Sequence, residues 1–299
     1  MAQTLFFTVV VPAYNRPEAL RSCLQALVGQ DFDRASFEVI VVDDGSLIPL
    51  QSVLDAFDYL PSIKFIRQPN SGPAIARNVG AAHARGRFVA FTDDDCRPSP
   101  SWLSCLAMRI SSLPHSLVGG YTVNALPGNL FSTASQMLID SMYRFYNANP
   151  DSARFVASNN ICLSVAQFQS LGGFDRRFRL AAAEDRDFCY RWLEDQRQIV
   201  FAPEAQVFHA HHLSLGSFFA QHYHYGRGAF FFRADRARRS RSALQLEPLG
   251  FYFGLLIDPL RQPSSQFFVL TALLVALAQV ANAVGFFREA LYGSLPRAN

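Results

Sequence analysis

Lysine is almost missing from this sequence. Its 299 residues include 27 basic side chains, and Lys64 is the one lysine among them. The formal net charge is only +3, which is too small to indicate a nucleic-acid-binding protein. Half of the residues are hydrophobic and 17% are charged, which is typical of a folded chain rather than a disordered one. At this length the chain can bury one large core, alone or with an appendage.

Cysteines are few and scattered. The sequence has five of them, and no two form a C-x-x-C pair. It therefore predicts neither a zinc site nor a disulfide framework, and we expect reduced thiols. The first residues, MAQTLFF, lack the basic segment of a signal peptide and lead directly into a predicted strand. We therefore expect the N-terminal part of the chain to stay in the cytoplasm.

A glycine-rich loop is missing after the first predicted strand. Residues 5–11, LFFTVVV, read as a fully buried strand that Pro12 is expected to end. The loop that follows, PAYNRPEAL, contains no glycine. This absence disfavours a nicotinamide-binding fold, which needs G-x-G-x-x-G at this point. It also disfavours a nucleotidyltransferase with a glycine-rich phosphate loop.

Buried strands alternate with helices through the first hundred residues. FEVIVVDDGS, Ile63–Arg67 and RFVAFTDDD are predicted strands, and helices are expected from Pro17 and from Gly72. Strands without polar–apolar alternation, separated by helices, predict an α/β fold with a mostly parallel sheet sandwiched by helices. Ligands bind such sheets beyond the carboxyl ends of the strands. The polar residues at these ends are Asn15, Arg16, Asp43, Asp44, Asp93, Asp94 and Asp95.

The pattern becomes mixed from about residue 118. LVGGYTV and NNICLSV are predicted strands, and AEDRDFCYRWLED is a predicted helix that begins with acids. Two further strands are expected on either side of Pro203. The sequence shows no internal repeat and no low-complexity linker.

Three adjacent aspartates end the fourth predicted strand. In an extended segment Asp93 and Asp95 point to one side and Asp94 to the other. Two carboxylates on one side suit a hard cation such as Mg²⁺ or Mn²⁺, whereas a solvated acidic loop is the alternative reading. The buried strand before them and the second acidic strand end favour the cation.

Two other acidic pairs also have two interpretations. Asp43 and Asp44 are suited to reading a base or ribose, or to capping a turn. Glu184 and Asp185 begin a helix, where the helix dipole favours acids in any protein. A carboxylate there also suits the general base that takes a hydroxyl proton in group transfer from a nucleotide diphosphate.

The segment FHAHH carries three histidines. His209 and His211 lie on one face of a predicted strand and His212 on the other. Metal ligation, phosphate contact and simple packing remain open for them. No cysteine or carboxylate lies at the local spacing of a self-contained zinc site, so we do not expect one.

Taken in order, these stretches resemble the family 2 glycosyltransferases, which adopt the GT-A fold. The resemblance covers roughly residues 5–226, and its specificity comes from the order of motifs that are weak individually. It implies an inverting transfer of one sugar from a UDP- or GDP-sugar to a glycan, a lipid-linked acceptor or another hydroxyl. The matching segments are TVVVPAYNRPEAL, FEVIVVDDGS, NSGPAIARNVGAAHARGRFVAFTDDDCRPSPSWL, NNICLSVAQFQSLGGFD, AEDRDFCYRW and FHAHH.

The resemblance also implies roles for single residues. Asp185 is similar to the catalytic base, with Glu184 beside it near the acceptor. QHYHYGRG lacks the Arg-Trp of the Q-x-x-R-W motif of processive members, which favours single-sugar transfer. The implied ligands of a divalent cation, Mn²⁺ or Mg²⁺, are Asp95, Asp93, His209 and His211. The implied nucleotide-binding residues are Pro12, Ala13, Tyr14, Arg16, Asp43, Asp44, Arg77, Asp93 and Asp94.

The composition changes after residue 226. Residues 267–287 are almost continuously apolar and about as long as the roughly 20 residues that span a bilayer. Gln279 and Asn282 interrupt this run, so an in-plane helix paired with LGFYFGLLIDPL, a buried core helix and a dimer interface are alternatives. Basic residues near such a helix attract anionic lipid. The cluster is Arg233, Arg236, Arg238, Arg239 and Arg241.

We therefore expect two parts, a GT-A nucleotide-sugar domain over residues 1–226 and a basic, hydrophobic helical region over residues 227–299. The second part is expected to contact the membrane, which places the protein at the cytoplasmic face of the cell membrane. Two functions compete with a glycosyltransferase: a nucleotidyltransferase on a similar sheet, and an inactive membrane-bound scaffold that binds nucleotide. The filled acidic positions disfavour the scaffold.

Overall fold

A mixed eight-stranded sheet runs through the molecule in the order β3-β2-β1-β4-β7-β6-β8-β5. The computed structural model describes residues 5–57, 62–178, 182–257 and 268–293. The strands are β1 (Phe7–Ala13), β2 (Phe37–Asp43), β3 (Ile63–Arg67), β4 (Phe88–Phe91), β5 (Cys96–Pro98), β6 (Leu117–Asn124), β7 (Ile161–Ser164) and β8 (Ile199–His209). The helices of eight or more residues are α1 (Pro17–Val28), α3 (Pro73–Ala82), α4 (Trp102–Ser112), α5 (Leu130–Tyr146), α7 (Glu184–Glu194), α8 (Leu215–Ser240), α9 (Leu249–Ile257) and α10 (Phe268–Tyr292).

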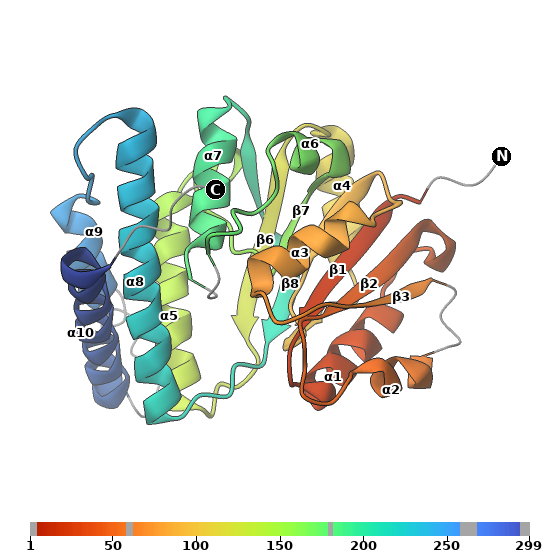
Figure 1. Cartoon of the computed structure of the whole chain (residues 1–299), viewed down its shortest axis with the longest axis horizontal. Helices are drawn as coiled ribbons and strands as arrows, with labels where there is room; N and C mark the ends of the chain where they lie inside the picture. Colours follow the sequence, from red (N-terminus) through yellow and green to blue (C-terminus); the bar gives the residue numbers. More distant parts are fainter. Residues whose placement is uncertain (1–4, 58–61, 179–181, 258–267, 294–299) are drawn as a thin grey trace.

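Helices cover both faces of the N-terminal half of the sheet (Figure 1). β1 pairs in parallel with β2 and β4, and β2 pairs in parallel with β3. Val10 of β1 packs in one core cluster with Ala74 of α3, whereas Val9 packs in the other with Leu20 of α1. Because both faces of β1, β2 and β4 are buried, these three strands show no polar–apolar alternation. The predicted α/β fold is confirmed.

Both prolines expected to interrupt strands lie inside them. β1 continues through Pro12 to Ala13, and its pairing with β4 ends at Val10, so the missing N–H is tolerated where β1 has one neighbour. The two strands predicted around Pro203 are a single strand, β8. A register shift against β6, between Gly120 and Tyr121, absorbs Pro203 as a bulge.

The helices α5, α8, α9 and α10 gather beside the sheet (Figure 1). α8 runs without a break across residues 226 and 227. It meets α10 at two glycines: a Cβ on Gly226 would lie 1.9 Å from the Asn282 carbonyl oxygen, and one on Gly285 would lie 2.0 Å from that of Tyr223. Both glycines are therefore required for this close approach of the two helix backbones.

α10 has one packed face and one exposed apolar face. Thr271, Val275 and Ala278 are buried, whereas Leu273 and Phe287 are more than 60% exposed. Val269–Tyr292 is, among the described residues, the one helix long and apolar enough to cross a membrane, by length and composition. The two polar residues that interrupt its apolar sequence, Gln279 and Asn282, line a cavity and do not belong to the exposed apolar face. All five cysteines are free.

Candidate active site

Strand pairing brings the third predicted aspartate to the histidines. β5 pairs antiparallel with β8, and Cys96 lies opposite His209. Asp95, one residue before β5, therefore reaches His209, with 3.3 Å between its Oδ1 and the ring Nε2. The rings of His209 and His211 stack with their centroids 4.7 Å apart. The topology thus joins residues that are more than a hundred positions apart in the sequence.

The three aspartates lie in a turn, which corrects the extended segment expected from the sequence. The Cys96 N–H donates to the Asp93 carbonyl oxygen at 3.0 Å and closes this turn. As a result Asp94 and Asp95 both pair with Arg16, with 2.8 Å between Arg16 Nη2 and Asp94 Oδ1. Asp93 points elsewhere and pairs with Arg77. The two outer carboxylates therefore face different arginines.

Arg77 links the strand end to the start of α7. Its guanidinium is almost fully buried and donates to Asp93 Oδ1 at 2.7 Å and to Glu184 Oε1 at 3.0 Å. It also lies over the ring of Phe174, 5.6 Å from the centroid. Burial opposes the charge, but the two carboxylates outweigh it and hold the pKa of Arg77 above its usual value. Both terminal nitrogens, Nη1 and Nη2, are thus engaged by protein carboxylates.

The acids at the start of α7 have raised pKa values. Burial raises the pKa of Asp185, although the Arg186 N–H donates to its Oδ1 at 2.8 Å. Burial, together with the negative charge of Asp185, raises the pKa of Glu184 to about 7. The residue before them, Ala183, has a left-handed φ of 69°. A carboxylate with a raised pKa is a better proton acceptor than an ordinary one.

Asp43 and Asp44 make the contacts of turn caps. Asp43 is fully buried and accepts the Ser46 N–H at 2.9 Å, while Arg67 lies 3.4 Å away. Asp44 accepts the N–H groups of Ser71 and Gly72 at 2.9 and 2.8 Å, at the start of α3. These contacts are those expected if Asp43 and Asp44 cap turns, which is one of the two interpretations that the sequence left open. They fix the loops around the strand ends.

The nucleotide-binding residues predicted on the first loop divide into two groups. Pro12 and Ala13 are buried in the end of β1, whereas Tyr14 and Arg16 are exposed beyond it. Asp94 is fully buried and accepts the Tyr14 N–H at 3.2 Å. Burial, only partly offset by Arg16, raises its pKa to about 7. Asp94 thus holds this loop in place from inside the protein.

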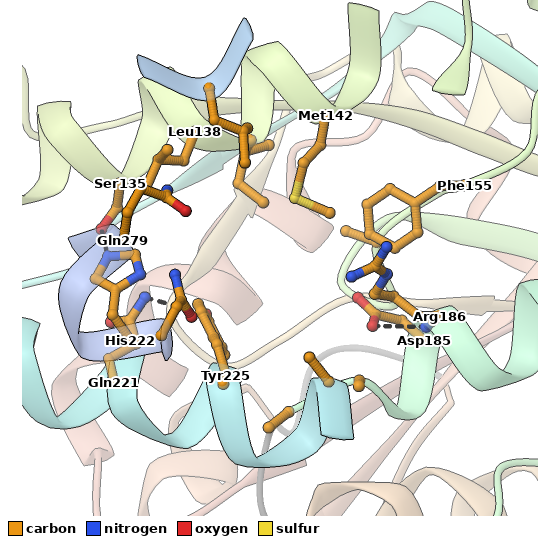
Figure 2. A pocket seen from close by; sticks show the side chains of 18 of the residues that line it. Ser135, Leu138, Met142, Phe155, Asp185, Arg186, Gln221, His222, Tyr225 and Gln279 are labelled. Atoms are coloured by element: carbon orange, nitrogen blue, oxygen red, sulfur yellow. Dashed lines mark hydrogen bonds between the residues drawn. The ribbon is translucent and has the colours of Figure 1, made fainter. Parts of the chain in front are cut away.

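A cavity of about 570 Å³ joins these elements. Asp93, Asp185, His209 and His211 line it together with Arg77. Figure 2 shows Asp185 and Arg186 on one side of the cavity, and His222, Gln221 and Gln279 on the other. The predicted base and the predicted metal-binding region therefore open into one space.

Sequence reasoning missed the far wall of the cavity. Tyr225 and Arg233 of α8 and Gln279 of α10 line it, and the sequence patterns that contain them did not predict a place in the site. Arg233 was assigned to a membrane-facing basic cluster, but it is only 6% exposed. Arg239 from the same cluster pairs with Asp187 at 2.6 Å. The spacing of these arginines along α8 offers no signal that separates the buried ones from the exposed ones.

Sequence comparison identifies the family. The chain matches the profile of glycosyl transferase family 2 over residues 8–166 and that of glycosyl transferase family group 2 over residues 88–286. A pre-mycofactocin glycosyltransferase from Mycobacterium tuberculosis is 31% identical over 227 residues, which are 74% of this chain and 46% of that protein. This chain therefore spans about half the length of that relative.

Solved structures share the fold. The mannosyltransferase PcManGT from Pyrobaculum calidifontis, in complex with GDP-Man and Mn²⁺, matches with a TM-score of 0.62 at 18% identity, covering 97% of this chain and 76% of that one. Staphylococcus aureus TarS 1-349 matches with a TM-score of 0.55 at 19% identity, covering 98% of this chain and 93% of that one. The fold is GT-A-like, and the family 2 profile covers more than half of the sequence, including the aspartate turn. This chain belongs to glycosyl transferase family 2.

Proposed function

We propose that this protein transfers one sugar, with inversion, from a nucleotide diphosphate sugar to a hydroxyl acceptor. The observation that carries the proposal is that Asp93, Asp185 and His209 line one cavity. The ion pairs of Arg77 with Asp93 and Glu184 support it, because they fix the strand end relative to the start of α7. A single displacement needs donor, acceptor and base in such a fixed arrangement.

Asp185 is the proposed base. It takes the proton of the acceptor hydroxyl as that oxygen attacks the anomeric carbon from the face opposite the nucleotide. The bond from that carbon to the diphosphate oxygen breaks, and the nucleoside diphosphate leaves. The raised pKa of Asp185 suits this role. Glu184, one residue earlier, is held by Arg77 and is proposed to position the acceptor side of the site.

The residues around Asp95 fit a divalent cation. Asp95, Cys96 and His209 each place a ligand atom within 4.8 Å of the others. Carboxylate ligands suit both Mn²⁺ and Mg²⁺. We propose that Asp95, His209 and His211 hold it, together with the Asp93 carboxylate oxygen that is not paired with Arg77. Such an ion would neutralise charge on the leaving diphosphate.

The donor is proposed to be a GDP- or UDP-sugar. The structural neighbour from Pyrobaculum was solved with GDP-Man and Mn²⁺, which favours testing GDP-sugars first. The exposed side chains of Tyr14 and Arg16, beyond the end of β1, are proposed to contact the nucleotide. The absence of Arg-Trp from QHYHYGRG supports transfer of a single sugar rather than polymer synthesis.

Residues 227–299 are proposed to contact the cytoplasmic face of an anionic membrane. The exposed apolar side chains of α9 and α10, Phe253 and Leu273 among them, support this proposal. Arg238 and Arg288 keep about half of their side chains exposed and supply positive charge. Binding to anionic vesicles that survives high salt would support it. Full release by salt, or equal recovery without vesicles, would refute it.

The direct test of the proposed reaction is donor turnover with water as acceptor. Nucleotide sugars are first screened by thermal shift with and without Mn²⁺, and the best donor is then followed by proton NMR. We expect release of nucleoside diphosphate, with the free sugar appearing first in the anomeric form opposite to that of the donor. EDTA should stop turnover, and added Mn²⁺ should restore it. Retention of configuration, or binding without any turnover, would contradict the proposal.

A further inference from the structure

The part of the cavity beyond Asp185 is built from the C-terminal helices and is mainly apolar. α5 contributes Leu138 and Met142, α9 contributes Phe251 and Leu255, and α10 contributes Phe286. The whole cavity, including the end at Asp93 and Asp185, has a volume of about 570 Å³, within the roughly 300–1,000 Å³ of small-molecule pockets. Gln221, His222 and Gln279 are outnumbered by apolar side chains here, so an extended glycan would leave hydroxyls unpaired. The walls therefore suit an acceptor with an apolar body.

Arg233 is the charged group in this apolar region. It is 6% exposed, and its Nη2 donates to the Tyr252 hydroxyl at 3.2 Å. The guanidinium carbon lies 5.8 Å from the centroid of the Phe286 ring. Among the described residues Arg233 forms no ion pair with a carboxylate. Burial and the nearby charge of Arg186 lower the pKa of Arg233, and the Tyr252 hydroxyl and the Glu247 carboxylate oppose this lowering only in part.

Arg186 stands near Arg233 and is itself weakly compensated. Its Nη2 donates to the Tyr146 hydroxyl at 2.6 Å, and the nearest carboxylate, that of Glu247, is 3.8 Å away. Arg186 directly follows Asp185 in α7 and also lines the cavity. The two arginines therefore give one wall a net positive charge, close to the carboxylate proposed as base.

A buried arginine without an acid is costly. Arg77 and Arg233 are the two arginines that are almost fully buried among the described residues, and Arg77 has two carboxylate partners. Removing a charge from water without a partner costs several kcal/mol. Carboxylates and phosphates are the groups that compensate a guanidinium best, often through two parallel hydrogen bonds.

We propose that this cavity binds the acceptor, and that the acceptor is an anionic amphiphile with three parts. Its hydroxyl lies at Asp185, its apolar body lies between α5, α9 and α10, and its carboxylate or phosphate pairs with Arg233. This inference rests on the proposed function, because it takes Asp185 as the base. It adds a specificity residue and a chemical class of acceptor, whether the acceptor is free in solution or carried by a lipid.

Binding of matched probes tests the inference without turnover. 12-Hydroxydodecanoate carries a hydroxyl, an apolar body and a carboxylate, whereas 1,12-dodecanediol lacks the charge. Calorimetric titration of the full chain should show affinity for the acid at least about tenfold above that for the diol. Arg233→Gln should remove that preference, and Arg233→Lys should keep part of it. Arg21→Gln makes the same charge change on the surface of α1, away from the cavity, and should keep that preference fully.

A lipid-borne acceptor is tested with phosphatidylcholine vesicles with and without phosphatidate. If Arg233 is needed for the preference for the soluble acid, the acceptor is a free amphiphile. If Arg233 matters only for binding to phosphatidate vesicles, the acceptor is carried by a lipid. The melting temperature separates binding from folding, since loss of an unpaired buried cation should leave it unchanged or raise it. Equal binding by wild type and Arg233→Gln, both to the soluble probe and to the vesicles, overturns the inference. So does a variant with a lowered melting temperature that still prefers the anionic probe as strongly as wild type.

The two proposals fail in different ways. If the protein binds the anionic probe through Arg233 but turns over no nucleotide sugar, the proposed reaction is wrong and the acceptor site stands. If turnover is present but Arg233→Gln leaves probe binding unchanged, the reaction stands and the acceptor class is wrong.

Discussion

Arg77 and Arg233 are both buried arginines, but their charges have different partners. Both are almost fully buried and both line the cavity, but Arg77 lies between two carboxylates and Arg233 contacts a hydroxyl and a ring. The first arginine completes a rigid framework at the ends of the strands. The second leaves a positive charge among apolar helices. In our proposals the first arginine belongs to the preorganised reaction end of the cavity, and the second to the end that binds an anionic acceptor.

A second charged cluster resembles the Arg77 end. Asp175, Asp187 and Asp235 come close enough to hold a metal ion. Arginines already neutralise these aspartates: Arg177 pairs with Asp175 and Asp235, and Arg239 pairs with Asp187 and Asp235. This network ties α7 to α8 and so fixes the start of α7 against the helical wall. We interpret it as structural.

The largest effect on stability is expected from breaking the Arg77 end. Arg77→Met leaves Asp93 and Glu184 without their partner in a buried site. Loss of one partner of a buried ion pair costs about 3–5 kcal/mol in unfolding free energy, and turnover should fall with it. Denaturant titration measures the first quantity and donor turnover the second.

The control for that variant is an exposed pair. Arg21→Met removes the partner of Glu18, 3.6 Å away on the surface of α1. Such pairs contribute about 0–1 kcal/mol. Similar losses of unfolding free energy in both variants would mean that the ion pairs of Arg77 contribute no more than an exposed ion pair.

A smaller effect is expected from the contact between α8 and α10. Gly285→Ala puts a Cβ 2.0 Å from the Tyr223 carbonyl oxygen, which forces the helices apart. We expect a loss of about 1–3 kcal/mol in unfolding free energy and weaker binding of the anionic probe. Gly254→Ala is the matched control in α9, where the new Cβ meets nothing within 4 Å. It should be neutral or stabilising, and equal losses in the two variants would contradict this account of the packing.

The smallest predicted effect is a displaced pH profile. An aspartate base works only when it is deprotonated, and burial raises the pKa of Asp185. Activity should therefore fall as the pH drops through a value above the roughly 3.9 of a free aspartate. The acidic limb of kcat/KM measures this pKa in the free enzyme. Glu184→Gln removes the neighbouring carboxyl, whose pKa is about 7. If the acidic limb of kcat/KM disappears in this variant, that limb reports Glu184 and not Asp185.

Local sequence patterns predicted the strands well. The runs that became β2 and β4 are short, apolar and bounded by acids or turns, so their burial could be recognised without tertiary information. The placement of Glu184 and Asp185 at the start of α7 was predicted for the same reason. These features depend on residues that are neighbours in the chain.

Tertiary contacts explain what could not be predicted. The turn at Asp93–Asp95 depends on Arg16 and Arg77, which come from other elements. β8 passes through Pro203 because β6 accommodates a bulge there. The burial of Arg233 depends on α9 and α10, which fold back over α8. In each case a distant partner decides what the local pattern leaves open.

The most direct test of the central claim is the effect of Asp185→Asn on transfer and on donor affinity, measured in parallel. The substitution keeps the size of the side chain and removes its ability to accept a proton. We predict that turnover falls by about 10²–10⁴-fold, the usual contribution of a general base, while affinity for the nucleotide sugar stays within a few-fold of wild type. Turnover close to that of wild type, with unchanged affinity, would contradict the assignment of Asp185 as the base.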